Sequence, residues 1–294
     1  MKKTFELRRT CGLGLAGMLL ASGASAQTAT ELWRTTGFSS PESVDWDSTA
    51  GVFYVSNMGK DPMAKDGDGY IAIMGADGAI KTDKWVTGLD APKGLATVGG
   101  KLYTADLDQL VEIDTATGSV SNRYPAKGAV LLNDVTAAPD GRIFVSDTFG
   151  NSVWVLENGA MSIFAQDPML MGANGLTGIG NALIVADLGD ASQGFDKRKP
   201  GYVVSIDLAS KAITAYGSAD PSGALDGIEP DGAGGVLFTD NMGGRLMQQA
   251  PSGAATEAGK LEPGAADMEF VPDQNLVVVP MPRANTVVGY SWKK

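Results

Sequence analysis

The sequence predicts an all-β protein: a six-bladed β-propeller with four antiparallel strands in each blade. One short segment recurs six times, and every copy begins with a chargeable or amide residue. We call these the lead residues, and in chain order they are Glu42, Lys93, Asn133, Asn174, Asp226 and Asp267. Each is followed by a turn containing Gly, Asp or Asn and then by an apolar run, and successive lead residues are 40 to 52 residues apart. Strands that recur at such a period are typical of propellers.

The apolar runs and the turns between them place the strands within each blade. Asp140-Gly141 and Asn158-Gly159 suit tight hairpins whose residues need positive φ, so they separate neighbouring strands. In blade one we expect strands at 43–46, 52–56, 70–74 and 81–86. In blade three we expect them at 135–138, 143–147, 152–157 and 161–165.

The last blade lacks a strand of its own. No residues remain for a fourth strand after 286–292, whereas the segment 28–36 alternates apolar and polar residues and has no neighbour to pair with. We therefore expect 28–36 to complete blade six and close the ring, which removes exposed sheet edges.

The first 26 residues resemble an export signal. Basic residues at the start precede a short apolar run, and Ala24-Ser25-Ala26 offers a cleavage site before Gln27. The sequence thus predicts a signal peptide at 1–26, a single propeller domain at 27–294, and a periplasmic or secreted location. The apolar run is too short for a membrane span, so no membrane insertion is expected. The net charge of −11 argues against nucleic acid as a partner.

Composition also limits the chemistry. The chain has no histidine, and its one cysteine, Cys11, lies within the expected signal. A Ser-His-Asp triad, a Cys-His pair and a thiolate metal site are therefore excluded. Any catalysis must use carboxylates, lysine, tyrosine, hydroxyl groups or a metal bound by oxygen.

The lead residues open the inner strands, so all six should lie near one rim of the ring, which we call the top. The connections 58–69 and 188–201 are long and emerge at the same rim from blades one and four. Because those blades face each other, we expect the two loops to wall a cleft over the channel. Surface decoration without function is the alternative.

Three carboxylates, two amides and one lysine would thus converge on a narrow channel. Clustered carboxylates out of water resist ionisation unless a cation joins them. Carboxylate and amide oxygens together suit a hard cation such as Ca²⁺ or Mg²⁺. Two alternatives remain: the polar residues could bind only ordered water, or Lys93 could pair with Glu42 or Asp226 and neutralise the ring.

Four segments of the chain resemble the SMP-30/gluconolactonase family, which includes luciferin-regenerating enzymes. They are Ser40-Pro41-Glu42-Ser43-Val44-Asp45-Trp46, Leu132-Asn133-Asp134, Asn174-Gly175-Leu176 and Leu225-Asp226-Gly227-Ile228. The resemblance implies a six-bladed propeller that holds one divalent cation through Glu42, Asn174 and Asp226, with Asn133 helping to hold metal or substrate. Ca²⁺ is the expected ion, and Mg²⁺, Mn²⁺ and Zn²⁺ stay open.

The resemblance further implies hydrolysis of a small-molecule lactone or related ester. The metal would polarise the carbonyl, and Asp226 is the expected catalytic carboxylate that assists a water molecule. Asn133, Lys93 and Asp267 are expected to bind substrate. Lys93 departs from the family pattern, so its charge could instead occupy the place of the metal.

Two other functions remain open. The segment 139–147 is similar to NHL-repeat propellers, which commonly bind a small ligand or a protein partner through the top face without catalysis. A propeller chemistry resembling that of strictosidine synthase is the third possibility.

A second recurrence ends the second strand of five blades. These residues are Asn57, Asp106, Asp147, Asp187 and Asp240. We expect them to accept backbone N–H bonds from neighbouring loops, as short acids at strand ends commonly do. Contact with a ligand at the channel mouth is the alternative.

Overall fold

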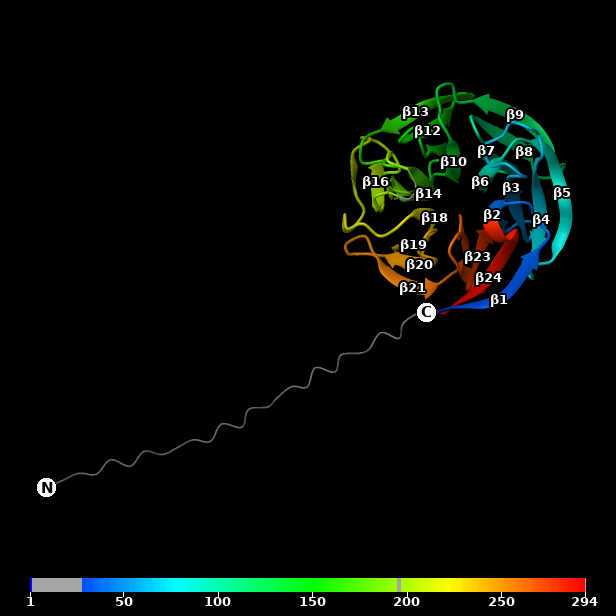
Figure 1. The fold of residues 1–294 in the computed structure, drawn as a ribbon. Coiled ribbons are helices and arrows are strands. Elements are labelled where there is room, and N and C mark those ends of the chain that lie inside the picture. The colour runs from blue at the N-terminus through cyan, green and yellow to red at the C-terminus, as the bar shows by residue number, and fades with distance from the viewer. Residues whose placement is uncertain (2–27, 195–196, 294) are drawn as a thin grey trace.

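The computed structural model describes Met1 and residues 28–194 and 197–293. These residues form six four-stranded antiparallel sheets arranged as blades around a central channel (Figure 1). The six-bladed propeller predicted from the sequence is confirmed. Except for Met1, the expected signal peptide lies outside the described residues. In the described part of the chain, no helix is long and apolar enough to cross a membrane.

The strands follow one another from the channel outward in every blade. Blades one to three are β2 (Pro41–Asp47), β3 (Val52–Asn57), β4 (Gly69–Gly75), β5 (Ile80–Leu89); β6 (Pro92–Val98), β7 (Lys101–Asp106), β8 (Gln109–Asp114), β9 (Ser119–Pro125); and β10 (Leu132–Ala137), β11 (Ile143–Asp147), β12 (Ser152–Glu157), β13 (Ala160–Gln166). Blades four to six are β14 (Ala173–Ile179), β15 (Ala182–Asp187), β16 (Val203–Asp207), β17 (Ile213–Ala215); β18 (Leu225–Pro230), β19 (Val236–Asp240), β20 (Arg245–Gln249), β21 (Thr256–Lys260); and β22 (Glu269–Val271), β23 (Leu276–Met281), β24 (Thr286–Lys293), β1 (Thr28–Thr36). Two short 3-10 turns, η2 (Pro272–Gln274) and η3 (Pro282–Ala284), flank β23.

Blade six is closed by the first strand of the described chain. β1 pairs antiparallel with β24, in a register that runs from Thr30 opposite Ser291 to Thr36 opposite Thr286. A Cβ atom at Gly289 would lie 2.3 Å from the Trp33 ring, so the indole requires a glycine at that position. The expected closure is confirmed, and it joins the two ends of the propeller in one sheet (Figure 1).

The core lies between neighbouring blades. Phe144 and Phe164 of blade three meet edge to face, with ring centroids 4.9 Å apart, and pack against Leu176 and Leu183 of blade four. Phe53 of blade one packs in the same way with Val278 of blade six. Each blade therefore depends on its neighbours for burial of its apolar faces.

Bulges at the start of the inner strands aim the lead residues. In five blades the register between the first and second strands shifts at the same place, just around the lead residue. These shifts lie between Pro41 and Val44, Pro92 and Leu95, Leu132 and Val135, Ala173 and Leu176, and Leu225 and Ile228. Because a bulge bends the strand and changes the direction of one side chain, this repeated feature turns five of the six leads toward the channel.

Candidate functional site

The structure brings the six lead residues together around the channel, and Asp267 is the one that also lines the cavity further down. Five of them are almost fully buried, with 9% or less of their surface exposed, and Asn133 is partly buried. Hydrogen bonds or charge interactions link each one to at least one other member of the ring.

A chain of amides ends on Asp226. Asn133 Nδ2 donates to Asn174 Oδ1 and, at 3.1 Å, to the Thr148 hydroxyl. Asn174 Nδ2 then donates to Asp226 Oδ1 at 3.0 Å. Asn241 Nδ2 donates to the other carboxylate oxygen, Oδ2, at 2.9 Å. Both oxygens of Asp226 are thus held by amide groups.

These contacts set the ionisation of Asp226. Burial raises its pKa to about 6, while the hydrogen bonds from Asn241 and Asn174 and the charge of Lys93 act in the opposite direction. The carboxyl group therefore titrates closer to neutrality than an ordinary aspartate, yet it is mostly ionised at pH 7.

Glu42 differs from the other lead residues in its lack of side-chain hydrogen bonds within the described part of the chain. Only 8% of its surface is exposed, and its Oε2 atom has no hydrogen-bond partner among the described residues. Burial and repulsion from Asp226 and Asp267 raise its pKa well above the usual range, although Lys93 opposes this rise. A buried carboxylate oxygen without a donor is an available ligand for a hard cation.

Lys93 is directed at the blade-one loop rather than at a carboxylate. Its Nζ atom lies 3.0 Å from Met58 Sδ and donates to the Pro62 carbonyl at 3.2 Å. In the described part of the chain, no carboxylate oxygen lies within the 4.0 Å of an ion pair with it, so the pairing with Glu42 or Asp226 does not form. Burial lowers the pKa of this lysine.

Asp267 faces further down the channel. Its Oδ2 accepts a 2.5 Å hydrogen bond from the Ser43 hydroxyl, and its Oδ1 accepts one of 2.7 Å from the backbone N–H of Met268. Burial raises its pKa to about 7. Its role in substrate binding stays a prediction, and its position separates it from the amide chain around Asp226.

A second polar feature lies below the ring, around a cavity of about 260 Å³. Five acids line this space, and we call them the lower carboxyl cluster: Asp45, Asp134, Glu229, Asp267 and Glu269. Burial is the largest cause that raises the pKa of each of them. Asp267 is itself a lead residue. The residue pattern did not point to the other four, although each follows a lead residue by one to three positions.

Carboxylates alone do not complete a metal site in this protein. Among the described residues, no group of three or more His, Cys, Asp or Glu side chains is arranged to hold a metal ion. A cation at the top of the channel would need amide oxygens beside Glu42 and Asp226. Asn174 and Asn241 are the amide residues that bond directly to Asp226, at 3.0 and 2.9 Å.

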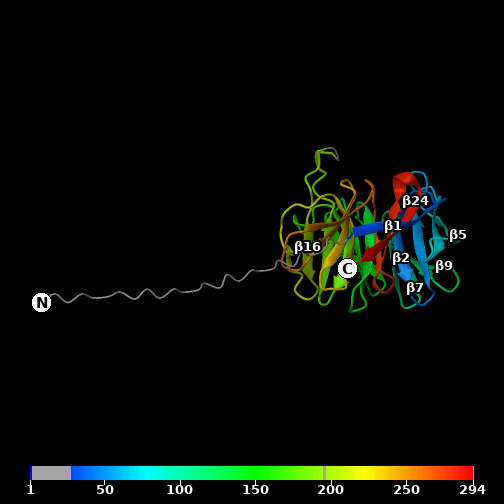
Figure 2. The ribbon, with the colours of Figure 1, turned by 90° about the horizontal axis from the view of Figure 1, so that it is seen from below.

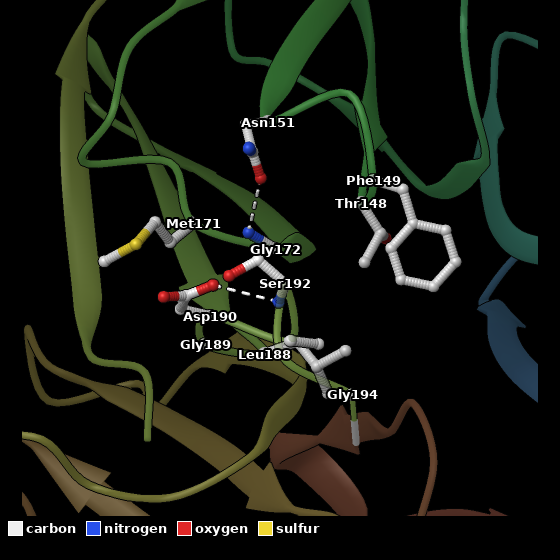
Figure 3. Close-up of a pocket in the computed structure, with 11 residues that line it drawn as sticks. Thr148, Phe149, Asn151, Met171, Gly172, Leu188, Gly189, Asp190, Ser192 and Gly194 are labelled. Carbon is white, nitrogen blue, oxygen red and sulfur yellow. Dashed lines mark hydrogen bonds between the residues drawn. The ribbon is translucent and has the colours of Figure 1, made fainter. Parts of the chain in front are cut away.

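The two long loops do not share the cavity that was expected between them. The large cavity at the top, about 490 Å³, is lined by blade three and the blade-four loop, without residues from 58–69 (Figure 3). The blade-one loop instead supplies the Met58 and Pro62 contacts to Lys93. The blade-four loop projects from one rim of the propeller (Figure 2).

The acids at the strand ends play the expected structural role, with one exception. Asp106 accepts the backbone N–H groups of Asp90 and Ala91, and Asp147 accepts those of Val130 and Leu131. Asn57 and Asp240 accept equivalent bonds from Ser39 and Ala224. For Asp187 the expectation is wrong.

Asp187 is fully buried, and neither of its carboxylate oxygens has a hydrogen-bond partner in the described chain. The corresponding N–H group, that of Gly172, donates to Asn151 Oδ1 at 3.0 Å instead. Burial raises the pKa of Asp187 well above its usual value.

Several functional contacts escaped the analysis of the sequence. Met58, Thr148 and Asn241 each contact a lead residue, and each directly follows a member of the strand-end series. That position could have been found as a further recurrence, because it places a side chain against a lead residue in three blades.

No family model and no curated protein matches this sequence. Solved structures of other proteins do match this chain. A gluconolactonase from Xanthomonas campestris matches with a TM-score of 0.66 and 16% identity, over 96% of this chain and 100% of that one. A luciferin-regenerating enzyme matches with a TM-score of 0.66 and 12% identity, over 91% and 95%. Virginiamycin B lyase from Staphylococcus aureus matches with a TM-score of 0.60 and 16% identity, over 90% and 98%. The chain therefore has the six-bladed propeller fold that gluconolactonases and luciferin-regenerating enzymes share.

Proposed function

We propose that this protein is a divalent-metal-dependent hydrolase of lactones or related esters. Its cation, Ca²⁺ by preference, is held by Glu42, Asn174 and Asp226. The observation that carries the proposal is the buried, unpartnered Oε2 atom of Glu42, whose pKa is raised by burial and by the charge of Asp226. A hard cation shared by these oxygens would remove both the desolvation cost and the repulsion.

The surroundings of the ring fit such a cation. Lys93 is engaged by the blade-one loop, and among the described residues it forms no ion pair with Glu42. Asn174 Oδ1 accepts a hydrogen bond from Asn133, so cation binding requires that this bond be exchanged. Asn133 would then be available to hold a substrate oxygen, in agreement with its predicted role.

Different residues of the chain have different roles in the proposed hydrolysis. A divalent cation at this site would supply Lewis-acid polarisation of the substrate carbonyl. Asp226 is the base that accepts a proton from the attacking water. Asn174 and Asn241 fix the orientation of that base. Lys93 would bind a negatively charged or carbonyl oxygen of the substrate.

A histidine-dependent reaction is disfavoured. The virginiamycin B lyase structure is that of a catalytically inactive variant in which a histidine is replaced by alanine. This chain has no histidine at all, whereas the proposed metal-dependent hydrolase needs only carboxylate, amide and lysine side chains beside its cation.

The test is a calorimetric Ca²⁺ titration of chelator-stripped protein that begins at Gln27. We expect binding at one site that Glu42→Gln abolishes. Glu112→Gln is the matched control, because Glu112 is equally buried, with 8% exposed, but hydrogen-bonded to Tyr103 and Tyr124 outside the ring. A panel of lactones should be hydrolysed only by proteins that bind the ion.

Two results would contradict the proposal: full activity without metal, or no metal binding by the wild-type protein. If no lactone is hydrolysed but a ligand still binds at the top face, the non-catalytic propeller becomes the better description. Mg²⁺, Mn²⁺ and Zn²⁺ are compared in the same titration.

We also propose that the protein is exported to the periplasm or secreted, on the basis of the basic start, apolar run and Ala24-Ser25-Ala26 site. Intact-mass measurement of the exported protein should give a chain that starts at Gln27. A mature protein that retains residues 1–26 in the cytoplasm would contradict export.

A further inference from the structure

The cavity at the top of blades three and four has the size of a small-molecule pocket. Its volume is about 490 Å³, within the roughly 300–1,000 Å³ that is usual for such pockets. Three segments form its walls: residues 148–151 after β11, residues 171–172 before β14, and the first part of the blade-four loop (Figure 3).

The large side chains of the wall are apolar. They are Phe149, Met171 and Leu188, and the adjoining wall is backbone of Gly172 and Gly189. Phe149 keeps 41% of its surface exposed, although it is one of the largest apolar side chains of the protein. An apolar occupant of the cavity would bury this surface.

The polar side chains of the wall already have partners on the protein. Asn151 Oδ1 accepts the N–H group of Gly172 at 3.0 Å, and Asp190 Oδ1 accepts that of Ser192 at 3.0 Å (Figure 3). Asp190 is also paired with Lys199 at 3.4 Å. These hydrogen bonds hold the walls together and use part of the polar capacity of a cavity whose large side chains are apolar.

The cavity and the ring meet at Thr148. This residue lines the cavity, and its hydroxyl accepts the 3.1 Å hydrogen bond from Asn133 of the ring. Leu188 adjoins the same wall and occupies, in blade four, the position that Thr148 has in blade three. One ligand can therefore present a carbonyl to the ring and an attached group to the cavity.

From this arrangement we infer that the cavity binds an apolar substituent of the substrate. The preferred substrates are then lactones or esters with an alkyl or aryl group of several carbons, rather than polyhydroxylated sugar lactones. The inference rests on the proposed hydrolase function for its reaction, and on Phe149, Met171 and Leu188 for its specificity.

The experiment compares δ-lactones that share one six-membered ring: δ-valerolactone, δ-octalactone, δ-decalactone and the polyhydroxylated gluconolactone. For the full mature protein with Ca²⁺, kcat/KM should rise about fourfold for each added methylene group, as expected from about 0.8 kcal/mol per buried CH₂. Gluconolactone should be the poorest substrate. Ala191→Trp, which fills the cavity, should bring the ratio of δ-decalactone to δ-valerolactone close to one.

Two further variants make the test robust. Phe149→Ala removes bulk instead of adding it and should lower the same ratio, which covers the case in which Ala191→Trp fails to fold. Ala209→Trp is the matched control, because Ala209 is exposed in the turn between β16 and β17 of the same blade and should leave the ratio unchanged.

A binding measurement separates this inference from the hydrolase proposal. Calorimetry with 2-pentylcyclohexanone and cyclohexanone, which cannot be hydrolysed, should show tighter binding of the pentyl compound and loss of that preference in Ala191→Trp. This result without any lactonase activity would support the cavity and overturn the hydrolase. Hydrolysis with no dependence on chain length, and equal binding of both ketones, would overturn the cavity alone. Absence of both binding and hydrolysis would overturn both.

Discussion

Asn174 donates a hydrogen bond of 3.0 Å from Nδ2 to Asp226 Oδ1 across the boundary between blades four and five. Asn241 holds the second oxygen of the same carboxylate at 2.9 Å. Because both bonds favour the ionised form, they oppose the burial that raises the pKa of Asp226 to about 6. The pKa of Asp226, the base of the proposed reaction, thus depends on residues of two blades.

Loss of one of these donors should move the pH dependence of activity. Asn241→Ala removes a bond that stabilises ionised Asp226, so the pKa of Asp226 should rise. If the ionised form is the active one, the acidic limb of kcat/KM against pH moves upward by about one pH unit, the equivalent of a hydrogen bond of about 1.4 kcal/mol. Activity at pH 6 should fall more than activity at pH 8.

The control for this measurement is Asn181→Ala. Asn181 donates to Asp207 at 3.0 Å in the same kind of amide–carboxylate pair, but on the exposed surface of blade four. Asn181→Ala should leave the acidic limb of the kcat/KM profile at the same pH as in the wild-type protein. An Asn241→Ala profile that keeps the wild-type limb would show that Asp226 is not the titrating base.

Lys93→Met should strengthen binding of the cation. The positive charge of Lys93 interacts with Glu42 and Asp226, and it would repel a cation that these carboxylates hold. Its removal should lower the Kd for Ca²⁺ about tenfold, since charges close to a buried site typically contribute about 1–2 kcal/mol at a high effective dielectric constant. Calorimetry measures the change. Binding that appears only in the variant would mean that lysine replaces the cation in the wild-type protein.

Asp187→Asn should stabilise the protein at alkaline pH. Burial raises the pKa of this unpartnered carboxyl in the folded state, so folded protein disfavours ionisation, and stability declines as pH rises above the unfolded value of about 4. The variant should gain about 1–3 kcal/mol in free energy of unfolding at pH 8, and much less at pH 4. Urea unfolding at both values checks this.

The equivalent substitution in blade three provides the contrast. Asp147 accepts N–H groups from Val130, Leu131 and Gly150, so Asp147→Asn should cost about 1.5–3 kcal/mol, as is usual for bonds to a charged group. If both variants change stability in the same direction, Asp187 must have partners in solution.

Glu229→Gln should remove part of the pH-dependent loss of folding stability that the lower carboxyl cluster causes. Burial, and then the charges of Glu269, Asp267, Asp134 and Asp45, raise the pKa of Glu229 well above the usual value. Ionisation of the cluster therefore destabilises the fold as pH rises from about 4. We expect a higher Tm for the variant at pH 8 and a similar Tm at pH 4, measured by calorimetry.

Glu257→Gln, on the exposed face of β21, should leave Tm nearly unchanged at both pH values. An equal Tm for Glu229→Gln and wild-type protein at pH 8 would show that counterions or water already offset the charge of the cluster.

Much of the fold could be predicted from the sequence because propeller strands repeat. The predicted bounds 143–147 and 152–157 agree with β11 and β12, and Thr28–Thr36 closes blade six as expected. Local alternation, turn residues and a fixed period are all encoded within short segments, so they survive in a single sequence. The same period placed Asn133, Asn174 and Asp226 at one rim.

The sequence by itself determined the ring, its six lead residues and the exclusion of histidine and thiol chemistry. Only the tertiary structure decided how those side chains pair. It turned Lys93 toward Pro62 and placed Asn241 on Asp226. It also left Glu42 Oε2 and both carboxylate oxygens of Asp187 without a hydrogen-bond partner among the described residues. The physical reason is that periodicity fixes where a backbone position lies, whereas hydrogen bonds and burial depend on loops and side chains from separate blades that meet only in the closed ring.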